Sequence, residues 1–218
     1  MPNDPQHWDA RYRSENHRAE TEPAPLLCEL LPFLAHGRAL DLAMGGGRNA
    51  VFLAANGWHV TGVDSSRIAL ENAAALAEAR GLPVLWVSSS EYRESRASLQ
   101  APSKELTQKL PGLWLLQVDL EHSTLPAGQF ELVICFNYLQ RSLFSAIEAA
   151  LRPGGMLVYE TYTLDQLAFP KGPRNPDHLL RPEELRRAFP SLETLFYREL
   201  YAGKGIASLL ARRPARSP

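Results

Sequence analysis

The stretch ALDLAMGGGRNAVFLAANGWHVTGVDSS, residues 39–66, decides the fold because it joins two apolar runs through a glycine turn and a helical pattern. The first run breaks at Gly45, Gly46 and Gly47, and the second ends on Asp64. Glycines at the end of a strand let the backbone come close to a ligand, and the following helix offers unpaired N–H groups to negative charge. The stretch therefore predicts a strand, a turn that binds a nucleotide-like ligand, a helix and a second strand.

Similar short apolar runs recur along the chain and extend this pattern into a sheet. They are typical of strands buried on both faces of a parallel sheet, and they cover residues 38–43, 58–64, 113–118, 131–136 and 156–161. Helical patterns lie between them and stop before glycine or proline, as helices usually do, over residues 48–56, 66–80 and 141–151. The alternation predicts an α/β fold, with helices on both faces of a mostly parallel sheet.

The C-terminal part departs from this alternation. Two strand-like runs, residues 192–201 and 205–213, are joined by the short link AGKG. A crossover between parallel strands needs a dozen residues or so, which this link does not supply. The two runs therefore predict an antiparallel strand pair at one edge of the sheet.

The composition narrows the class of protein. With 218 residues, of which 45% are apolar and 22% charged, the chain predicts one globular domain over residues 1–218. Because no apolar run approaches the roughly 20 residues that cross a bilayer, and the N-terminus is polar, we expect a cytoplasmic protein without a membrane partner. A formal charge of −1, with no basic stripe, argues against nucleic acid as a partner.

The two cysteines, Cys28 and Cys135, lie far apart, one in a helical pattern and one in a strand pattern. We expect both to be buried thiols rather than a disulfide or a pair of metal ligands. No metal site is predicted. The oligomeric state is left open by the sequence.

The ligand of the glycine turn is not decided by glycine spacing alone. Gly45, Gly47 and Ala50 match the spacing of dinucleotide-binding proteins, and Asp64, seventeen residues after Gly47, is placed to accept hydrogen bonds from two ribose hydroxyls. Asp41, four residues before Gly45, is unusual for a dinucleotide site. A carboxylate late in the first strand suits a ligand with a cationic ammonium end.

Asp119 follows the third predicted strand, where it can accept a hydrogen bond from an adenine amine while Leu120 lies on the ring. The chain offers a second candidate for this strand, residues 82–87. We prefer residues 113–118 because the loop from there to the fourth strand then has an ordinary length. The antiparallel C-terminal pair is also foreign to the dinucleotide fold.

With these features the sequence resembles the class I S-adenosylmethionine-dependent methyltransferases, from about Trp8 to Arg213. Three segments resemble the small bacterial tellurite-resistance type most, namely WDARY (8–12), GGGRNAVFLA (45–54) and GPRNPDHLLRPEEL (172–185). The resemblance implies a Rossmann-like three-layer sandwich, S-adenosyl-L-methionine as cofactor and a small-molecule substrate. It assigns cofactor contacts to Asp41, Ala43, Gly45, Gly47, Asn49, Asp64, Ser65, Asp119, Leu120 and Asn137.

The resemblance also divides the rest of the chain. Residues 1–37 are expected to form an N-terminal helical lid, and the polar residues 88–112 a solvated insertion. Residues 162–180 follow the carboxyl end of the fifth strand, where ligands of such sheets bind, and are expected to form a substrate-side loop. No catalytic residue is assigned, and the substrate-side candidates are Tyr138, Tyr162 and Arg174.

Methyl transfer from a sulfonium is an in-line displacement that depends mainly on positioning, so a general base is not obligatory. An amine or hydroxyl acceptor would need one, and no convincing base is found in the predicted site. This favours a soft or anionic acceptor such as a thiol or a chalcogen oxyanion. Two alternatives stay open: an NAD(P)-dependent oxidoreductase, which Asp41 opposes, and a non-catalytic cofactor-binding protein that acts through a partner.

Overall fold

The computed structural model describes residues 5–13, 21–87 and 111–215. Most of the predicted insertion and part of the predicted lid therefore lie outside the described residues. The chain divides into two compact units, Met1–Pro126 and Ala127–Pro218. Each unit is described by itself, and the predicted single domain over residues 1–218 stays a prediction.

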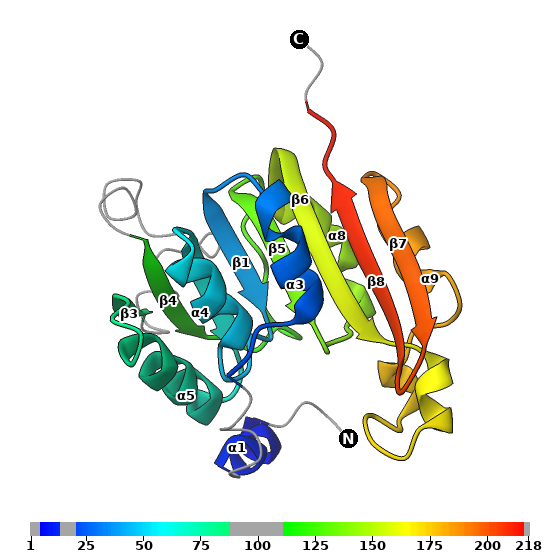
Figure 1. Ribbon diagram of the computed structural model, residues 1–218, viewed down its shortest axis with the longest axis horizontal. Helices are drawn as coiled ribbons and strands as arrows, with labels where there is room; N and C mark the ends of the chain where they lie inside the picture. Colours follow the sequence, from blue (N-terminus) through cyan, green and yellow to red (C-terminus); the bar gives the residue numbers. More distant parts are fainter. Residues whose placement is uncertain (1–4, 14–20, 88–110, 216–218) are drawn as a thin grey trace. The chain divides into compact units, whose positions relative to one another are not determined.

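The first unit contains four parallel strands in the order β3-β4-β2-β1 (Figure 1). Both candidates for the third strand of the sequence form strands, β3 at the outer edge and β4 hydrogen-bonded to β2. The choice of residues 113–118 as the neighbour of the second strand is thereby confirmed. The four strands are β1 (Arg38–Leu42), β2 (His59–Asp64), β3 (Val84–Val87) and β4 (Gly112–Gln117).

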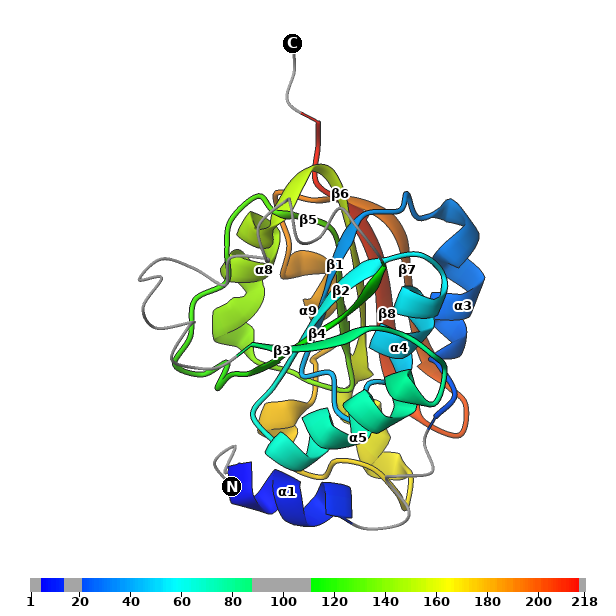
Figure 2. The ribbon, with the colours of Figure 1, turned by 90° about the vertical axis from the view of Figure 1, so that its left-hand side faces the viewer.

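The helices of the first unit pack on these strands through small side chains. Figure 2 shows α4 and α5 on the same side of the strands, and both contact β2 and β4. Ala69, Ala73 and Ala77 line the buried face of α5, so this helix comes close to the chain beneath it. The helices are α1 (Pro5–Arg13), α3 (Pro25–Leu30), η1 (Leu31–Phe33), α4 (Arg48–Ala55) and α5 (Arg67–Glu78).

The second unit contains four strands in the order β5-β6-β8-β7. β5 and β6 are parallel, whereas β8 is antiparallel to both β6 and β7, which confirms the predicted C-terminal pair. β8 is buried along nearly its whole length, while β7 lies outermost and is largely exposed. The strands are β5 (Phe130–Phe136), β6 (Leu151–Tyr162), β7 (Glu193–Tyr201) and β8 (Gly205–Arg212).

An aromatic cluster holds the helices of the second unit against its strands. The ring of Tyr159 on β6 lies 6.3 Å from that of Phe144 and 6.0 Å from that of Phe189, between centroids. Such pairs stabilise beyond the area that they bury. The helices are η2 (Arg141–Leu143), α8 (Phe144–Ala150), η3 (Leu164–Ala168), η4 (Pro176–His178) and α9 (Glu184–Arg187).

The helix predicted over residues 141–151 ends at Ala150, and β6 is longer than the predicted strand. The Pro153-Gly154-Gly155 segment belongs to β6, with Gly154 at φ +81°, because it pairs with the chain after β8. The amide of Gly154 donates to the carbonyl of Arg213, and the amide of Arg213 donates to that of Gly155, at 2.9 and 2.8 Å. A Cβ at Gly155 would lie 2.8 Å from the Phe130 carbonyl oxygen, so glycine permits this close approach.

The two cysteines are free thiols, as predicted. Cys135 is buried in β5, but Cys28 is exposed on α3, so the expectation of two buried thiols is wrong for Cys28. The six-residue helix α3 buries Leu26 and Leu27 and turns Cys28 toward solvent. A helix of this length has room for one buried stripe only.

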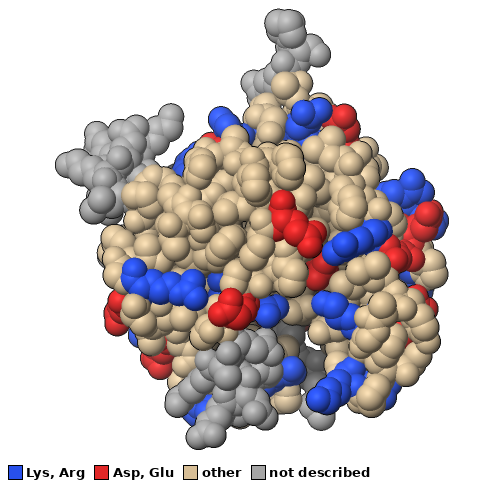
Figure 3. All heavy atoms as spheres, in the orientation of Figure 1, with Lys and Arg blue, Asp and Glu red and all other residues tan. Residues whose placement is uncertain are grey.

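None of the described helices combines the length and the hydropathy that a membrane span requires. On the face shown in Figure 3, Lys and Arg side chains are interspersed with Asp and Glu side chains. This distribution agrees with a formal charge near zero, at −1. The expected absence of a nucleic-acid partner stays a prediction.

Candidate active site

The turn after β1 has the backbone conformation that its glycines suggested. Ala43, Gly45 and Gly47 have φ values of +50°, +57° and +80°, in the left-handed region that glycine adopts without strain. Gly47 is the N-cap of α4, and its Cβ, if present, would lie 2.5 Å from the Cβ of Ala73 on α5. A Cβ on Gly46 would meet nothing within 4 Å, so the outer side of the turn is open.

Asp64 at the end of β2 is held by the glycine turn itself. Its Oδ2 accepts a hydrogen bond from the amide of Gly45 and its Oδ1 one from the amide of Ser66, each at 2.9 Å. Burial raises the pKa of this carboxyl to about 6, against the lowering effect of the amides of Ser66, Gly45 and Ser65. A carboxylate has about four acceptor positions. Both oxygens therefore keep capacity for ligand hydroxyls.

Asp41 is the least satisfied polar side chain of the turn. It is 2% exposed, and its Oδ2 is buried without a hydrogen-bond partner. Burial raises its pKa well above the usual range, and the charge of Asp64 raises it further. The charge of Arg48 and a hydrogen bond from the amide of Ala50 oppose this rise. An unpaired buried carboxylate oxygen is costly and requires a donor, preferably a cationic one.

These features fit S-adenosylmethionine. Its ammonium group would supply a cationic donor for the buried Oδ2 of Asp41, and its ribose would supply two hydroxyls for Asp64. The open side of Gly46 leaves room beside the turn.

Asn49 near the start of α4 is buried and links α4 to the residue before α3. Its Oδ1 accepts a hydrogen bond from the amide of Ala24 at 2.8 Å, which ties the residue before α3 to α4. This bond gives Asn49 a structural role. Its predicted contact with the cofactor stays a prediction.

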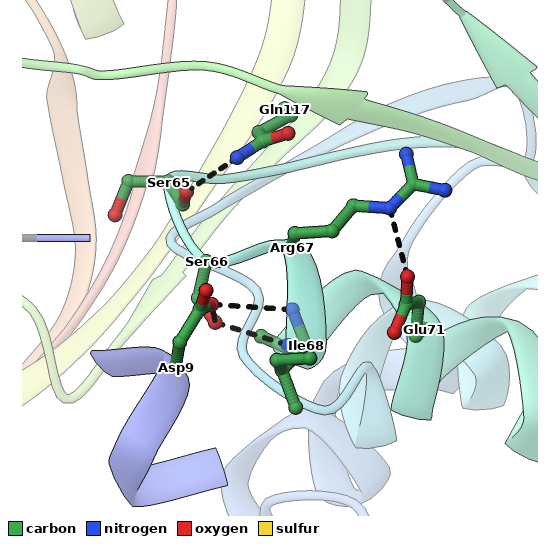
Figure 4. A network of polar contacts seen from close by, with 8 residues as sticks. Asp9, Ser65, Ser66, Arg67, Ile68, Glu71 and Gln117 are labelled. Carbon is green, nitrogen blue, oxygen red and sulfur yellow. Dashed lines mark hydrogen bonds and ion pairs between the residues drawn. The ribbon is translucent and has the colours of Figure 1, made fainter. Parts of the chain in front are cut away.

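The N-terminal helix α1 docks on the start of α5 (Figure 4). Asp9 accepts hydrogen bonds from the hydroxyl of Ser66 at 2.6 Å and from the amide of Ile68 at 3.3 Å. The side-chain amide of Asn72 donates to the Tyr12 carbonyl at 3.0 Å. The hydroxyl of Tyr12 lies 2.5 Å from where a Cβ of Gly45 would be, so Tyr12 covers the glycine turn.

The rings of Trp8 and Tyr12, which are four residues apart on α1, have their centroids 6.2 Å apart. Asp9 was missed, although it lies inside the WDARY segment. Because Arg13 follows Asp9 by four residues on the same helix, the sequence favours a local ion pair for Asp9 and gives no signal of a tertiary acceptor. Asp9 thus supplies a helix cap across 57 residues of sequence.

Asp119 lies just after β4, next to the end of β2, because the amide of Val118 donates to the carbonyl of Asp64 at 2.9 Å. Partial burial would raise the pKa of Asp119, but hydrogen bonds from His122 and from the amide of Glu121 lower it. Leu120 is buried. Asp119, Glu121 and His122 bring possible ligand atoms within 4.8 Å of one another, and the absence of a metal stays a prediction.

Ser65 contributes its backbone to the same region. Its carbonyl accepts a hydrogen bond from the side-chain amide of Gln117 at 3.1 Å, which fixes the turn after β2 to the end of β4 (Figure 4). In the first unit, the structure therefore brings Asp41, Asp64, Ser65 and the glycine turn together. The contact of each with the cofactor stays a prediction.

In the second unit, Asn137 and Tyr138 form the turn after β5. Asn137 has φ +57°, its side chain is exposed, and its amide donates to the carbonyl of Glu160 at 2.9 Å. The carbonyl of Tyr138 accepts from the hydroxyl of Tyr159 at 3.0 Å, and the hydroxyl of Tyr138 donates to Gln140. The phenol of Tyr138 is therefore oriented before any substrate binds.

The predicted substrate-side loop is pinned at both ends. The amide of Leu180 donates to the carbonyl of Tyr162, and that of Leu164 to the carbonyl of Leu180, each at 2.9 Å. The buried side chain of Gln166 accepts from the amide of Gly205 at 3.0 Å and donates to the carbonyl of Lys171. Arg174 is exposed and donates to the carbonyl of Leu167 at 2.7 Å.

The family of this chain follows from comparison with known proteins. A family model described as a methyltransferase domain matches residues 15–207. The chain belongs to this family of methyltransferases. The prediction of a methyltransferase is thereby confirmed at the level of this family.

Individual proteins agree with this assignment. The ubiquinone biosynthesis O-methyltransferase of Marinobacter nauticus is 28% identical over 171 residues, which are 70% of this chain and 61% of that protein. The S-adenosylmethionine dependent methyltransferase from Mesorhizobium loti is 20% identical, with a TM-score of 0.60 over 87% of this chain and 96% of that one. TehB from Haemophilus influenzae is 15% identical, with a TM-score of 0.60 over 95% of this chain and 66% of that one.

The chain thus spans about three fifths of the curated relative's length, from the 61% coverage. The likeness to the solved structures confirms the predicted Rossmann-like α/β fold with its antiparallel C-terminal pair. Membership of this family supports the methyltransferase prediction over the oxidoreductase alternative.

Proposed function

We propose that this methyltransferase transfers the methyl group of S-adenosyl-L-methionine to a small molecule whose nucleophile is a thiol or a chalcogen oxyanion. The observation that carries the cofactor half of the proposal is the buried, unpartnered Oδ2 of Asp41 beside Asp64. We assign the ammonium group to Asp41, the ribose hydroxyls to Asp64, and the adenine edge to Asp119 and Leu120. Bound S-adenosylmethionine supplies a sulfonium, which makes its methyl group electrophilic.

We assign cofactor contacts to the backbone of the turn as well as to side chains. Ala43, Gly45 and Gly47 have left-handed conformations that give the turn its tight course. The backbone amides at the start of α4 favour the carboxylate of the cofactor. Asn49 keeps α4 in place, and we assign Ser65 and Asn137 to the rim of the cofactor site. Tyr12 and α1 are assigned the role of the lid, because Tyr12 lies over Gly45 and can exclude water there.

The proposed acceptor class rests on the hydrogen bonds and the exposure of the substrate-side residues Tyr138, Tyr162 and Arg174. The hydroxyl of Tyr138 donates a hydrogen bond to the side chain of Gln140, so its hydrogen is already engaged within the protein. Tyr162 is half-buried at the end of β6 and can form an apolar wall, whereas Arg174 is exposed and suits an anion. A thiolate or a reduced chalcogen oxyanion needs only to be held in line with the methyl group.

The name of the Marinobacter relative favours a second candidate, a hydroxyl acceptor. A hydroxyl has to lose a proton during the transfer, so this candidate requires a base. The two candidates therefore differ in their pH dependence. We also propose a cytoplasmic location, since a reducing compartment suits the free thiols of Cys28 and Cys135.

The experiment is an acceptor panel with purified full-length protein, read as release of S-adenosylhomocysteine. Thiophenol, 2-mercaptoethanol and selenite with a reductant represent the proposed class, and catechol and benzylamine represent hydroxyls and amines. We expect the thiols or the chalcogen oxyanion to be turned over at least about tenfold faster than the others. Faster turnover of catechol would favour the hydroxyl candidate and end the sulfur proposal.

Calorimetry with S-adenosylhomocysteine on the same protein tests the cofactor half separately. A ligand present at 100 times its Kd adds about 2.7 kcal/mol to the free energy of unfolding. Binding without turnover of any acceptor would support the non-catalytic alternative. No binding at all would remove the assignments of Asp41 and Asp64 together.

A further inference from the structure

Arg141 joins three segments of the second unit through one guanidinium group. Its Nε and Nη2 donate to the two carboxylate oxygens of Glu184, at 2.5 and 3.0 Å. Its Nη1 donates to the carbonyl of Asp177 at 2.7 Å, and its Nη2 to that of Leu179 at 2.9 Å. Arg141 therefore binds the first residue of α9 and the end of the loop after β6 at the same time.

Glu184 completes this arrangement from the other side. Its Oε2 also accepts from the amide of Arg181 at 2.8 Å, so the carboxylate holds the chain between the loop and α9. Burial would raise the pKa of Glu184, but the hydrogen bond from Arg141 lowers it. The side chains of Arg141 and Glu184 are 42% and 21% exposed, so the pair is partly shielded from solvent. Paired contacts with this geometry are stronger than single surface ion pairs.

Arg141 also lies directly after the turn that carries Tyr138. The hydroxyl of Tyr138 is held by Gln140, whose side-chain amide donates to the hydroxyl of Ser142 at 3.1 Å. The residues on both sides of Arg141 thus orient Tyr138, while the Arg141 side chain holds the loop after β6. Only a planar fork can bind a carboxylate and two carbonyls in this way, and lysine has no such fork.

We infer that Arg141 is a positioning residue for the methyl acceptor. Together with Glu184 it holds the turn 137–140 and the loop 164–180 in one fixed arrangement before the acceptor binds. The inference rests on the proposed function, because it assumes that the turn 137–140 and the loop 164–180 both face the methyl acceptor. Arg141 itself makes no contact with substrate in this account, so its loss acts on acceptor binding through the loop.

The test compares Arg141→Lys with Arg212→Lys. Arg212 is a matched control because it also forms a close pair with a glutamate, Glu193 at 2.6 Å, on strands away from the loop. Three quantities are measured on the full-length protein: hydrogen exchange of peptides within 164–180, S-adenosylhomocysteine affinity by calorimetry, and the steady-state constants for thiophenol.

For Arg141→Lys we expect exchange in the loop to be roughly tenfold faster, since one or two charge-assisted hydrogen bonds are lost. The KM for thiophenol should rise about tenfold with kcat reduced by less than about threefold, and cofactor affinity should stay within about twofold. Arg212→Lys should leave all three unchanged. Glu184→Gln, which keeps the shape but not the charge, should reproduce the loop effect in part.

Unchanged exchange in the loop of Arg141→Lys would overturn the inference. So would faster exchange with an unchanged KM, because the loop would then not bear on the acceptor. A parallel loss of cofactor affinity would indicate general damage and would also overturn it. If the wild-type protein binds S-adenosylhomocysteine but methylates no thiol, the proposed acceptor class is wrong. The inference about Arg141 is then tested by the KM of Arg141→Lys for the acceptor that the protein does use.

Discussion

The two units present their candidate site residues by different physical means. The first unit presents buried carboxylates on a backbone turn, and burial raises the pKa of both Asp41 and Asp64. The second unit presents exposed or half-buried side chains on loops, held by contacts such as those of Arg141 and Gln166. The first arrangement is costly without its ligand, whereas the second costs little and is easily altered.

The difference teaches how a fixed cofactor can be combined with a variable acceptor. A buried acid recognises one ligand very selectively, because any ligand without the matching donors leaves it unpaired. Loop side chains tolerate replacement, since they are exposed and their backbone is held by other residues. We therefore expect changes in the first unit to act on cofactor affinity and changes in the second unit on the acceptor.

The largest effect is expected for Asp64→Ala. It removes the acceptor of two ribose hydroxyls, and hydrogen bonds to a charged group are worth about 1.5 to 3 kcal/mol each, so affinity for S-adenosylhomocysteine should fall about 100-fold or more. Calorimetry measures this, with circular dichroism to show that the fold persists. Glu71→Ala is the control, because Glu71 lies on α5, the helix that follows β2, and pairs with exposed Arg67. An affinity within about threefold of wild type would remove the ribose assignment.

A smaller effect is expected from pH. The pKa of Asp64 is raised to about 6 in the folded protein from 3.8, so the folded state holds an extra proton between these values. Stability without ligand should therefore fall as pH rises through this window. Ligand affinity should change in the opposite direction and fall about tenfold for each pH unit below 6, because the carboxylate is the better acceptor. Calorimetry from pH 5 to 7.5 tests this, and a flat profile would contradict it.

A severalfold effect is expected for Asp9→Ala, which removes the cap that α1 supplies to α5. Loss of such a cap costs about 1 kcal/mol, so hydrogen exchange of residues 5–13 should quicken and cofactor affinity should fall about fivefold. Asp9→Asn is the matched control, since asparagine caps helices as well as aspartate does. If both variants behave as wild type, α1 is not a lid of the cofactor site.

The smallest effect on the cofactor is expected for Arg174→Gln in the second unit. Arg174 is exposed and donates a hydrogen bond to the carbonyl of Leu167, so S-adenosylhomocysteine affinity should stay within about twofold. The KM for an anionic acceptor such as selenite with a reductant should rise severalfold, whereas Arg152→Gln, which loses only a pair with Glu131, should not change it. A marked loss of cofactor affinity would break the division between the units.

Much of the fold could be predicted because its signals are local. The run 39–66 carries its own strand, turn, helix and strand, and the structure follows it closely. Asp64 and the glycine turn could be found in the same way. The place of Pro153-Gly154-Gly155 in β6 could not, because it depends on pairing with Arg213, which is distant in sequence.

The contacts of Asp9 and Arg141 escaped prediction for the same reason. Asp9 reaches Ser66 across 57 residues, and Arg141 reaches Glu184 across 43. Neither residue interrupts an apolar period, and the WDARY segment that contains Asp9 does not tell what its carboxylate binds, so each residue is predicted to be an ordinary surface charge. Their roles become visible only when the backbone amides and carbonyls that they satisfy are placed in space.

The docking of α1 also has a consequence for the order of folding. A nine-residue helix is marginal when isolated. The partners of α1 are Ser66, Ile68 and Asn72, which belong to α5 and to its N-cap. Although it is synthesised early, α1 can find its place only after these elements have formed. It should be the last part of the first unit to order and the first to detach, so the protein can open at its N-terminus without unfolding its sheet.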